Sequence, residues 1–353
     1  MIYIVSTVIV LAVLIFVHEF GHFLMAKLFN VYVLEFSLGF GPKIFSFKKN
    51  ETEYKVSAIP FGGYVKLLGE EDDDVPIELT KYSFNNKSAF QKIMIILGGP
   101  LFNFIFAGLF FAIVFLKGIT ILEPYIGDVQ KNMPAYTAGL KKGDKIVAID
   151  SFPVKKWSDI PEIIKKFNGK TLNITVLRNN KTLTLRITPV AKEYKNIFGE
   201  TKKRYFIGIV ADTTKIKVIH INPLQALIKG YEETYKWIKL TFISIVKLIE
   251  RIVPFSSLGG PILIGQIAGD TAKQGVLNFL YFLAVISVNL GVLNLIPFPV
   301  LDGGRILIII IEKIRGKEFD LKYMELIHKI GFSILIALMV FVFYNDILRI
   351  MHK

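Results

Sequence analysis

The sequence of 353 residues contains no cysteine, so disulfide bonds and thiolate-bound metal sites are excluded. A metal ion could be bound only by histidine, aspartate or glutamate, and histidine is itself rare, with five residues in the chain. Charge is missing from residues 1–17, where Tyr3 is the one ionisable side chain. Two of the five histidines, His18 and His22, follow directly after this uncharged stretch.

Apolar residues make up 52% of the chain and the mean hydropathy is +0.50, more apolar than is usual for a soluble globular protein. A helix that crosses a bilayer needs about 20 mostly apolar residues. Four stretches meet this requirement: residues 2–29, 93–116, 276 to about 311, and 327–348, the third being interrupted by prolines and an aspartate. The sequence therefore predicts a polytopic α-helical membrane protein with about four transmembrane helices. The first stretch lacks a basic leader and a small-residue cleavage site, so we expect it to be a span rather than a cleaved signal peptide.

The chain is basic, with a net charge of +14, and most of the excess lies between residues 117 and 229. Solubility or attraction to anionic lipid headgroups accounts for such a charge. No nucleic-acid-binding motif is present, so we expect no nucleic-acid partner. Lysines and arginines cluster before the fourth span rather than after it. The positive-inside rule then predicts that both chain ends, and the long segment between the second and third spans, lie outside the cytoplasm.

Between the first two spans the sequence has the alternating pattern and the glycines of β structure. Gly62 and Gly63 separate the strand-like residues 52–59 from 64–68, which predicts a hairpin. The acidic residues 70–74 are expected to form a solvated loop.

A soluble segment follows the second span. Residues 138–150 resemble the signature of PDZ domains, in which a turn leads into a buried strand, and residues 157–167 are typical of a helix. A predicted hairpin of residues 172–177 and 182–187 completes one PDZ-like α+β domain, a type that binds extended peptides by strand addition. Repeated lysines among apolar residues from 224 to 252 predict an amphipathic helix at the membrane surface rather than a fifth span.

The residues HEFGH at positions 18–22 lie within the first span. Two histidines four apart on a helix share one face and can hold one Zn²⁺ ion, and Glu19 between them is close enough to take a proton from an attacking water. Ionisable side chains are costly inside a membrane helix, so they indicate a functional site. The alternative is coincidence on a core helix. The combination predicts hydrolysis of a peptide bond within the membrane.

A catalytic zinc commonly has three protein ligands. Asp302 is the best candidate for the third, because it lies in a long apolar stretch where Pro297 and Pro299 prevent a regular helix. Taken alone, Asp302 is better explained as an interfacial turn residue; beside an intramembrane HExxH, the ligand becomes the favoured interpretation. Asn103, a polar residue in the second span, is expected either to lie next to the site or to serve helix packing.

Motifs along nearly the whole chain resemble, in order, those of bacterial site-2 proteases of the RseP/RasP type, which are intramembrane zinc metalloproteases. They are HEFGH at 18–22, GFGP at 39–42, GGYVKL at 62–67, GGPLFN at 98–103, the PDZ-like segment, and NLIPFPVLDGG at 294–304. The resemblance implies that His18, His22 and Asp302 bind zinc and that Glu19 is the general base.

The same resemblance implies that the hairpin from Gly62 to Leu68 dips toward the membrane and pairs with an extended substrate strand. With Asn103, the expected substrate-binding residues are Gly62, Gly63, Tyr64, Val65, Lys66, Asn294, Pro297 and Pro299. The chain departs from some relatives in having room for one PDZ-like domain rather than two. It also has Arg305 where several relatives have histidine, and the role of that position stays open.

We therefore expect four parts: an N-terminal membrane core (1–117), an extracytoplasmic PDZ-like domain (118–222), amphipathic surface helices (223–275) and a C-terminal membrane core (276–353). The expected fold combines about four transmembrane helices, a membrane-associated β-hairpin region and the inserted PDZ-like domain. The expected location is the bacterial cytoplasmic membrane, with the active site toward the cytoplasm.

The expected substrates are single-span membrane proteins in the lipid bilayer, such as trimmed anti-sigma factors or signal-peptide remnants, and a peptide C-terminus is a candidate ligand of the PDZ-like domain. Two other functions compete. A scaffold with a structural metal site would have no need of Glu19 as a base. A metal transporter would use intramembrane His and Asp, but a PDZ-like domain and proline breaks fit it less well.

Overall fold

The computed structural model describes residues 1–70 and 75–351 and divides into two compact units. The membrane unit consists of Met1–Val114, Pro223–Leu248 and Pro254–Lys353, and the inserted unit consists of Phe115–Asn222 and Ile249–Val253. Most of the inserted unit lies, in the sequence, between the second candidate span and the segment that begins at Pro223.

Four helices of the membrane unit are long and apolar enough to cross a bilayer, which confirms the predicted number of spans within the described residues. They are α1 (Ile2–Leu28), α2 (Ala89–Leu116), α7 (Val276–Asn294) and α9 (Leu321–Met351).

Several boundaries differ from the prediction, and α9 extends beyond the predicted 327–348 at both ends. Helix α2 begins at Ala89 rather than 93, because Ser88 and Gln91 cap it: the Gln91 backbone N–H donates to Ser88 Oγ and the Ser88 N–H donates to Gln91 Oε1. The third span ends at Asn294 instead of continuing to about 311, because proline cannot extend a helix; a separate helix α8 (Asp302–Arg315) follows the proline-containing loop.

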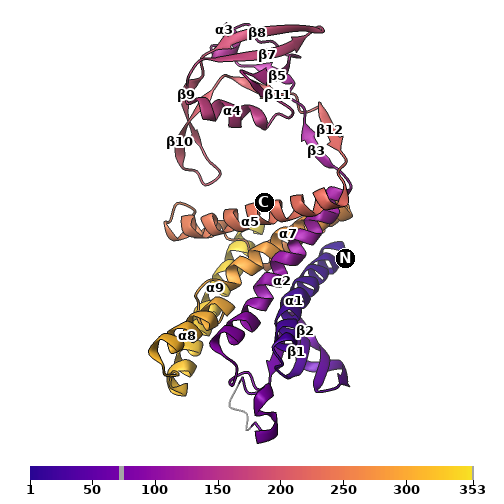
Figure 1. Ribbon diagram of the computed structural model, residues 1–353, viewed down its shortest axis with the longest axis vertical. Coiled ribbons are helices and arrows are strands. Elements are labelled where there is room, and N and C mark those ends of the chain that lie inside the picture. The colour runs from indigo at the N-terminus through magenta and orange to yellow at the C-terminus, as the bar shows by residue number, and fades with distance from the viewer. Residues whose placement is uncertain (71–74, 352–353) are drawn as a thin grey trace. The chain divides into compact units, whose positions relative to one another are not determined.

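Helices α1, α2 and α7 run side by side (Figure 1). Glycine allows the closest approach: a Cβ atom on Gly98 of α2 would lie 2.6 Å from the carbonyl oxygen of Gly21 of α1, so neither position accepts a side chain without a shift of backbone. Gly291 of α7 packs against the ring of Phe104 of α2 in the same way. These contacts bring α2 close to both α1 and α7.

Helix α9 packs differently. Only 6% of its most apolar window is buried, against 22–39% for the other three candidate spans, so its apolar side chains are suited to face lipid. It is attached by the buried carboxylate of Asp346, which accepts three backbone hydrogen bonds of 3.0 Å from Gly260, Ile262 and Leu263 at the start of α6 (Pro261–Gln274). Because a helix N-terminus has unpaired N–H groups and a partial positive charge, Asp346 both caps α6 and anchors α9.

Helix α5 (Pro223–Ile249) is amphipathic and is not among the candidate spans. It lies across α2 and α7 (Figure 1), with Gly230 against the backbone of Gly108 and with Thr241 Oγ1 donating a 2.6 Å hydrogen bond to Asn289. Its predicted position at a membrane surface stays a prediction.

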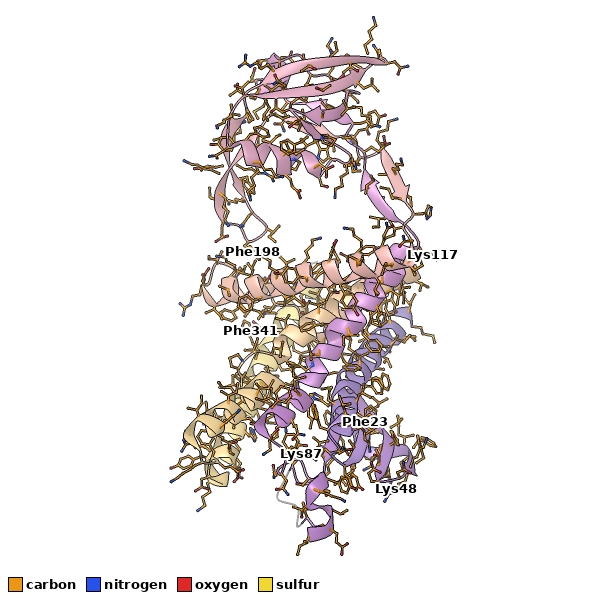
Figure 2. The ribbon with its side chains drawn as sticks, viewed as in Figure 1. Phe23, Lys48, Lys87, Lys117, Phe198 and Phe341 are labelled. Atoms are coloured by element: carbon orange, nitrogen blue, oxygen red, sulfur yellow. The ribbon has the colours of Figure 1, made fainter. Side chains whose placement is uncertain are left out.

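The hairpin region consists of β1 (Val33–Lys49) and β2 (Thr52–Leu67), both longer than the predicted strands. Each strand pairs with two parts of the other. Residues 33–38 pair with 63–67 on one side. On their other side, residues 35–38 pair with 53–56, which pair in turn with 45–48. Four segments therefore lie side by side, and residues 63–67 form one edge; among the described residues no further strand pairs with that edge. Figure 2 labels Lys48 near the turn of this region and Phe23 on the neighbouring α1.

The inserted unit is built on a four-stranded antiparallel sheet with the order β6-β5-β7-β8. Its strands are β5 (Lys145–Ile149), β6 (Phe152–Pro153), β7 (Leu172–Arg178) and β8 (Lys181–Ile187), with helix α4 (Asp159–Phe167) packed against the core. The predicted helix and hairpin are present; Asn179 and Asn180 form the hairpin turn with positive φ angles of 48° and 60°.

Three two-stranded pairs complete the inserted unit. They are β3 (Ile119–Leu122) with β12 (Ile216–Ile219), β4 (Ile126–Val129) with β11 (Ile209–Ala211), and β9 (Val190–Lys195) with β10 (Thr201–Phe206); the short helix α3 (Pro134–Thr137) follows β4. Within the segment that resembles the PDZ signature, Asp144 is 1% exposed and pairs with Arg178 at 2.6 Å. Its Oδ2 also accepts the backbone N–H of Lys141, so this carboxylate holds the turn before β5.

Candidate metal centre

The sequence spacing of His18 and His22 places both imidazoles on one face of α1. Their Nε2 atoms lie 3.2 Å apart, and both side chains are only slightly exposed, at 12% and 13%. Asp302, the first residue of α8, faces them, with its Oδ2 atom 3.3 Å from His18 Nε2 and 3.6 Å from His22 Nε2. Three residues that the sequence suggested as metal ligands are thus brought together from distant parts of the chain.

The donor set fits a zinc ion. Zinc–nitrogen and zinc–oxygen bonds of about 2.0–2.1 Å in a tetrahedron place ligand atoms about 3.3–3.4 Å apart. The three separations, 3.2, 3.3 and 3.6 Å, fall close to this value. In addition, Asp302 Oδ2 is buried and has no hydrogen-bond partner, an arrangement that is costly unless a cation is bound there. Two imidazoles and a carboxylate also leave a fourth position for water or substrate.

The other ring nitrogen of His22, Nδ1, forms a hydrogen bond that fixes the orientation of the imidazole. Its Nδ1 lies 3.0 Å from the carbonyl oxygen of Ile95 in α2, and because that oxygen can only accept, Nδ1 carries the proton. Nε2 of His22 is then unprotonated, and its lone pair is available to a metal ion beside Asp302. A metal-binding histidine typically has its other nitrogen fixed in this way.

His18 is held by two asparagines that the sequence had suggested for the site. Asn103 of α2 is fully buried and its side-chain amide lies 3.1 Å from His18 Nδ1; Asn294, the last residue of α7, lies 3.3 Å from His18 Nε2. Asn103 Oδ1 has no partner in the assigned orientation of the amide. A half-turn of that amide directs Oδ1 at His18 Nδ1, where it accepts the proton that a neutral imidazole must carry on Nδ1 when Nε2 is a ligand.

The approach of α2 to the histidines depends on Gly99. A Cβ atom there would overlap His22 Nε2 and would lie 2.7 Å from His18 Cε1. Helix α2 continues through Pro100, and Gly99 gives room to the imidazoles.

The base candidate Glu19 lies against the hairpin region. A Cβ atom on Gly63 would be 3.0 Å from Glu19 Cγ, 2.8 Å from Ile15 Cγ2 and 2.7 Å from the carbonyl oxygen of Ser37. Gly63 therefore lets the edge formed by residues 63–67 lie directly beside Glu19. Its neighbour Gly62 has a φ angle of 131°, a conformation that favours glycine, and packs on the ring of Phe40.

Three other hairpin residues do not reach the metal centre. The Tyr64 hydroxyl donates a 2.7 Å hydrogen bond to Glu35, Val65 packs on the core around Ala26, and Lys66 is paired with Glu35 across the strands. Lys55 also donates to Glu35 at 2.7 Å, and this hydrogen bond holds the pKa of Glu35 below its usual value. If these residues contact a substrate, they do so through the edge of the sheet.

A cavity of about 600 Å³ lies beside the loop that leads into α8. Its lining includes Pro299 and Arg305 on one side, and His328 and Phe332 of α9 on the other. Pro297 lies in the same loop between α7 and α8. His328 lies outside the HExxH motif, and its place on this cavity could not be inferred without the packing of α9.

Glu70 also lines this cavity, where it forms an ion pair with Arg305. The prediction that residues 70–74 form a solvated acidic loop is therefore wrong for Glu70, because its carboxylate is 19% exposed and paired with Arg305; residues 71–74 lie outside the described part of the chain. No local signal marks this pair, since the two residues are far apart in sequence and meet only when α8 packs beside the end of β2.

Comparison with known proteins places these features in a family. The family model described as peptidase family M50 matches residues 6–338. The chain is 31% identical to the regulator of sigma-E protease RseP of Escherichia coli, over 98% of each chain, and 31% identical to the zinc metalloprotease RasP of Geobacillus kaustophilus, over 98% of this chain and 97% of that one.

A third relative, from Agrobacterium fabrum, has a name that assigns it to the zinc metalloproteases; it is 36% identical over 98% of this chain and 95% of its own length. The alignments with the first two relatives span 447 and 420 positions, more than the 353 residues of this chain, so those two proteins contain additional segments.

Proposed function

We propose, from the premise that this chain belongs to peptidase family M50, that it cleaves peptide bonds within the transmembrane segments of single-span membrane proteins. By family it is a zinc metalloprotease. The observation that carries the proposal is the convergence of His18, His22 and Asp302 among apolar helices, beside a sheet edge that no other strand of the described residues pairs with. Such a site has both the metal ligands and the backbone partners that hydrolysis inside a membrane requires.

In this proposal His18 and His22 hold zinc through Nε2 and Asp302 holds it through Oδ2. The near-tetrahedral spacing of these atoms and the unpartnered Asp302 Oδ2 support the assignment. Bound zinc supplies a Lewis acid that polarises a carbonyl group and makes water acidic enough to attack it near neutral pH. Asn103 and the carbonyl of Ile95 orient the two imidazoles.

Glu19 is the proposed general base. Its carboxylate accepts the proton of the attacking water and returns it to the departing amine. Two features support the role: its place between the two histidines on α1 and its contact with Gly63, which holds it next to the edge where a substrate backbone would lie.

The edge formed by residues 63–67 is the proposed substrate-binding element. A transmembrane helix hides its peptide bonds, and unwinding it leaves N–H and C=O groups that must find partners in the membrane. An unpaired sheet edge provides those partners by strand addition. Asn294, Pro297 and Pro299 would line the opposite side of the substrate, since they lie at the end of α7 and in the loop that leads to Asp302.

We also propose a location and topology. The protein resides in a bacterial cytoplasmic membrane, supported by four candidate spans and by its relatives RseP and RasP. The inserted unit lies outside the cytoplasm and the metal centre lies toward the cytoplasmic side, as the distribution of lysine and arginine between the spans favours. The inserted unit is a PDZ-like domain that binds peptides and limits access of substrates; trimmed anti-sigma factors and signal-peptide remnants are the proposed substrates.

Cleavage of a single-span test protein by the purified enzyme in detergent tests the proposal. We expect cleavage within the apolar segment that is lost with a chelator and regained with zinc. Glu19→Gln should retain zinc while cleavage falls roughly 100- to 10,000-fold, because an amide cannot accept the proton. Cleavage by Glu19→Gln at the wild-type rate would refute the assigned base, and cleavage confined to soluble loops would refute intramembrane proteolysis.

A further inference from the structure

The inserted unit has cavities of its own, separate from the metal centre. Helix α4 and strand β10 border a cavity of about 590 Å³, lined on the α4 side by Lys165 and on the β10 side by Lys203 and Arg204. A second cavity of about 310 Å³ shares Pro161 and Arg204 with the first, so the two adjoin. Its floor is apolar, formed by Ile160, Ile164, Ile207 and others.

Positive charge dominates the first cavity. Its lining has four cationic side chains, Lys165, Lys202, Lys203 and Arg204, against one acidic side chain, Glu162. Lys202 lies 3.5 Å from Glu200, but in the part of the chain that the structure describes no ion pair involves Lys165, Lys203 or Arg204. Unpaired cations gathered on both walls of one groove favour an anionic ligand.

Strand β10 also has an edge available for pairing. It pairs with β9 on one side, and next to the turn the Asn196 N–H donates a 2.9 Å hydrogen bond to the Glu200 carbonyl. In an antiparallel pair, hydrogen-bonded residues alternate along each strand. Counting from Glu200, Lys202 and Arg204 direct their backbone groups at β9, whereas Lys203 directs its own at the opposite edge. No strand among the described residues pairs with that edge.

We propose that the groove between α4 and β10 binds an extended acidic peptide. The peptide adds a strand to the free edge of β10, places carboxylates beside Lys165, Lys203 and Arg204, and directs an apolar side chain into the 310 Å³ cavity. This inference deepens the proposed peptide-binding role of the inserted unit by naming the chemistry of its ligand. An anionic lipid headgroup would match the charge but would use neither the strand edge nor the apolar floor, so a peptide fits the observations better.

The test measures binding without turnover. Full-length Glu19→Gln protein in detergent is titrated with three labelled peptides, and fluorescence anisotropy reports the Kd. In the first peptide Glu alternates with Val, in the second Lys replaces Glu, and the third is the first with alternate backbone amides N-methylated. We expect the Glu peptide to bind at least about tenfold more tightly than either of the others, because both charge and strand pairing contribute.

A matched pair of variants locates the site. Lys203→Glu should weaken binding of the Glu peptide roughly tenfold. Lys181→Glu, at the β7–β8 turn and outside both cavities, changes the net charge equally and should leave the Kd nearly unchanged. Equal affinity for the Glu and Lys peptides, or no effect of N-methylation, would overturn the proposal even if a variant failed to fold. Binding of phosphatidylglycerol vesicles through Lys203 without peptide binding would assign the groove to lipid instead. None of these results depends on cleavage, so they are independent of the test of proteolysis.

Discussion

Arg305 and Glu70 form an ion pair that joins helix α8 to the end of the hairpin region. Arg305 lies one helical turn after Asp302, and Glu70 follows closely after Leu67, the last residue of β2. The pair therefore connects the helix that carries the proposed third zinc ligand to the edge proposed to hold the substrate. The resemblance implies a histidine at the position of Arg305 in several relatives, and a neutral imidazole would not make the same ion pair.

We predict that the ion pair sets the position of the substrate edge relative to the metal. Arg305→Glu should lower the cleavage rate about tenfold, because a small misplacement of the bound substrate relative to the metal slows the reaction. Zinc content should stay near wild type, since the three ligands are unchanged. Cleavage rate and elemental analysis on the same preparations measure the two effects separately.

The exchanged pair provides the control. Glu70→Arg combined with Arg305→Glu restores opposite charges, so cleavage should recover toward wild type. Lys329→Glu changes a charge on the same cavity without touching Glu70, because Lys329 pairs with Glu325, and its effect should be small. If the exchanged pair is no more active than Arg305→Glu alone, the two residues do not act through one another.

The proposed ligands predict zinc content. Purified protein should hold about one zinc ion per chain, and His22→Ala or Asp302→Ala should deplete it, because catalytic zinc depends on three protein ligands. His328→Ala is the control: this histidine lines the neighbouring cavity but is not part of the group of His18, His22 and Asp302. Full occupancy in Asp302→Ala would remove that residue from the coordination sphere.

Gly63 should be essential for the close approach of the sheet edge, residues 63–67, to the proposed general base Glu19. A side chain at this position would meet Glu19 Cγ, Ile15 Cγ2 and the Ser37 carbonyl, and relieving such overlap typically costs about 1–3 kcal/mol. We predict that Gly63→Val moves the edge away from Glu19, so that cleavage falls while zinc is retained. Tyr64→Phe removes only the hydrogen bond to Glu35 and should remain active. Normal cleavage by Gly63→Val would show that the edge does not need to touch Glu19.

Local patterns in the sequence were enough to predict those structural elements that depend only on neighbouring residues. The spans follow from apolar composition, and the face shared by His18 and His22 follows from the helical period. The turn at Asn179 and Asn180 follows from the preference of asparagine for positive φ. Asp302 was different: its place near the histidines rested on chemical reasoning and on the resemblance, because nothing local indicates which distant acid faces α1.

The helix cap formed by Ser88 and Gln91 is a local feature that the sequence could have revealed, and it moves the start of α2 earlier than hydropathy suggests.

Contacts between distant elements could not be inferred from the sequence. The pairing of Glu70 with Arg305 and the contact of Gly63 with Glu19 depend on how α8 and the hairpin region pack on the spans. Such packing is set by the shapes of many side chains together, which a periodic pattern does not encode.

Topology can be tested with single cysteines, because the natural chain has none. Cysteine at Asn180, in the exposed β7–β8 turn, should react with an impermeant maleimide added to intact cells. Cysteine at Asn85, an exposed residue before α2, should react only after the membrane is permeabilised. The reverse labelling pattern would invert the proposed orientation and place the metal centre toward the outer face.

The last prediction concerns the role of the inserted unit in selecting substrates. All proposed ligands and the base belong to the membrane unit, so removing the inserted unit should leave zinc binding intact. The main segment of the unit is suited to clean removal: its first and last strands, β3 and β12, pair with each other, with Ile119 opposite Ile219, so the two ends of that segment lie side by side. A short flexible linker can then replace residues 118–222.

We predict that the deletion variant cleaves a short single-span substrate at nearly the wild-type rate and also cleaves the same segment fused to a large external domain, which the complete enzyme excludes. The physical reason is that a folded domain can exclude bulky substrates without taking part in the chemistry, so its loss changes selection and not turnover. Comparing both substrates with both enzymes separates the alternatives. Unchanged discrimination would rule out a gating role, whereas loss of cleavage of even the short substrate, with zinc retained, would show that the unit docks substrates.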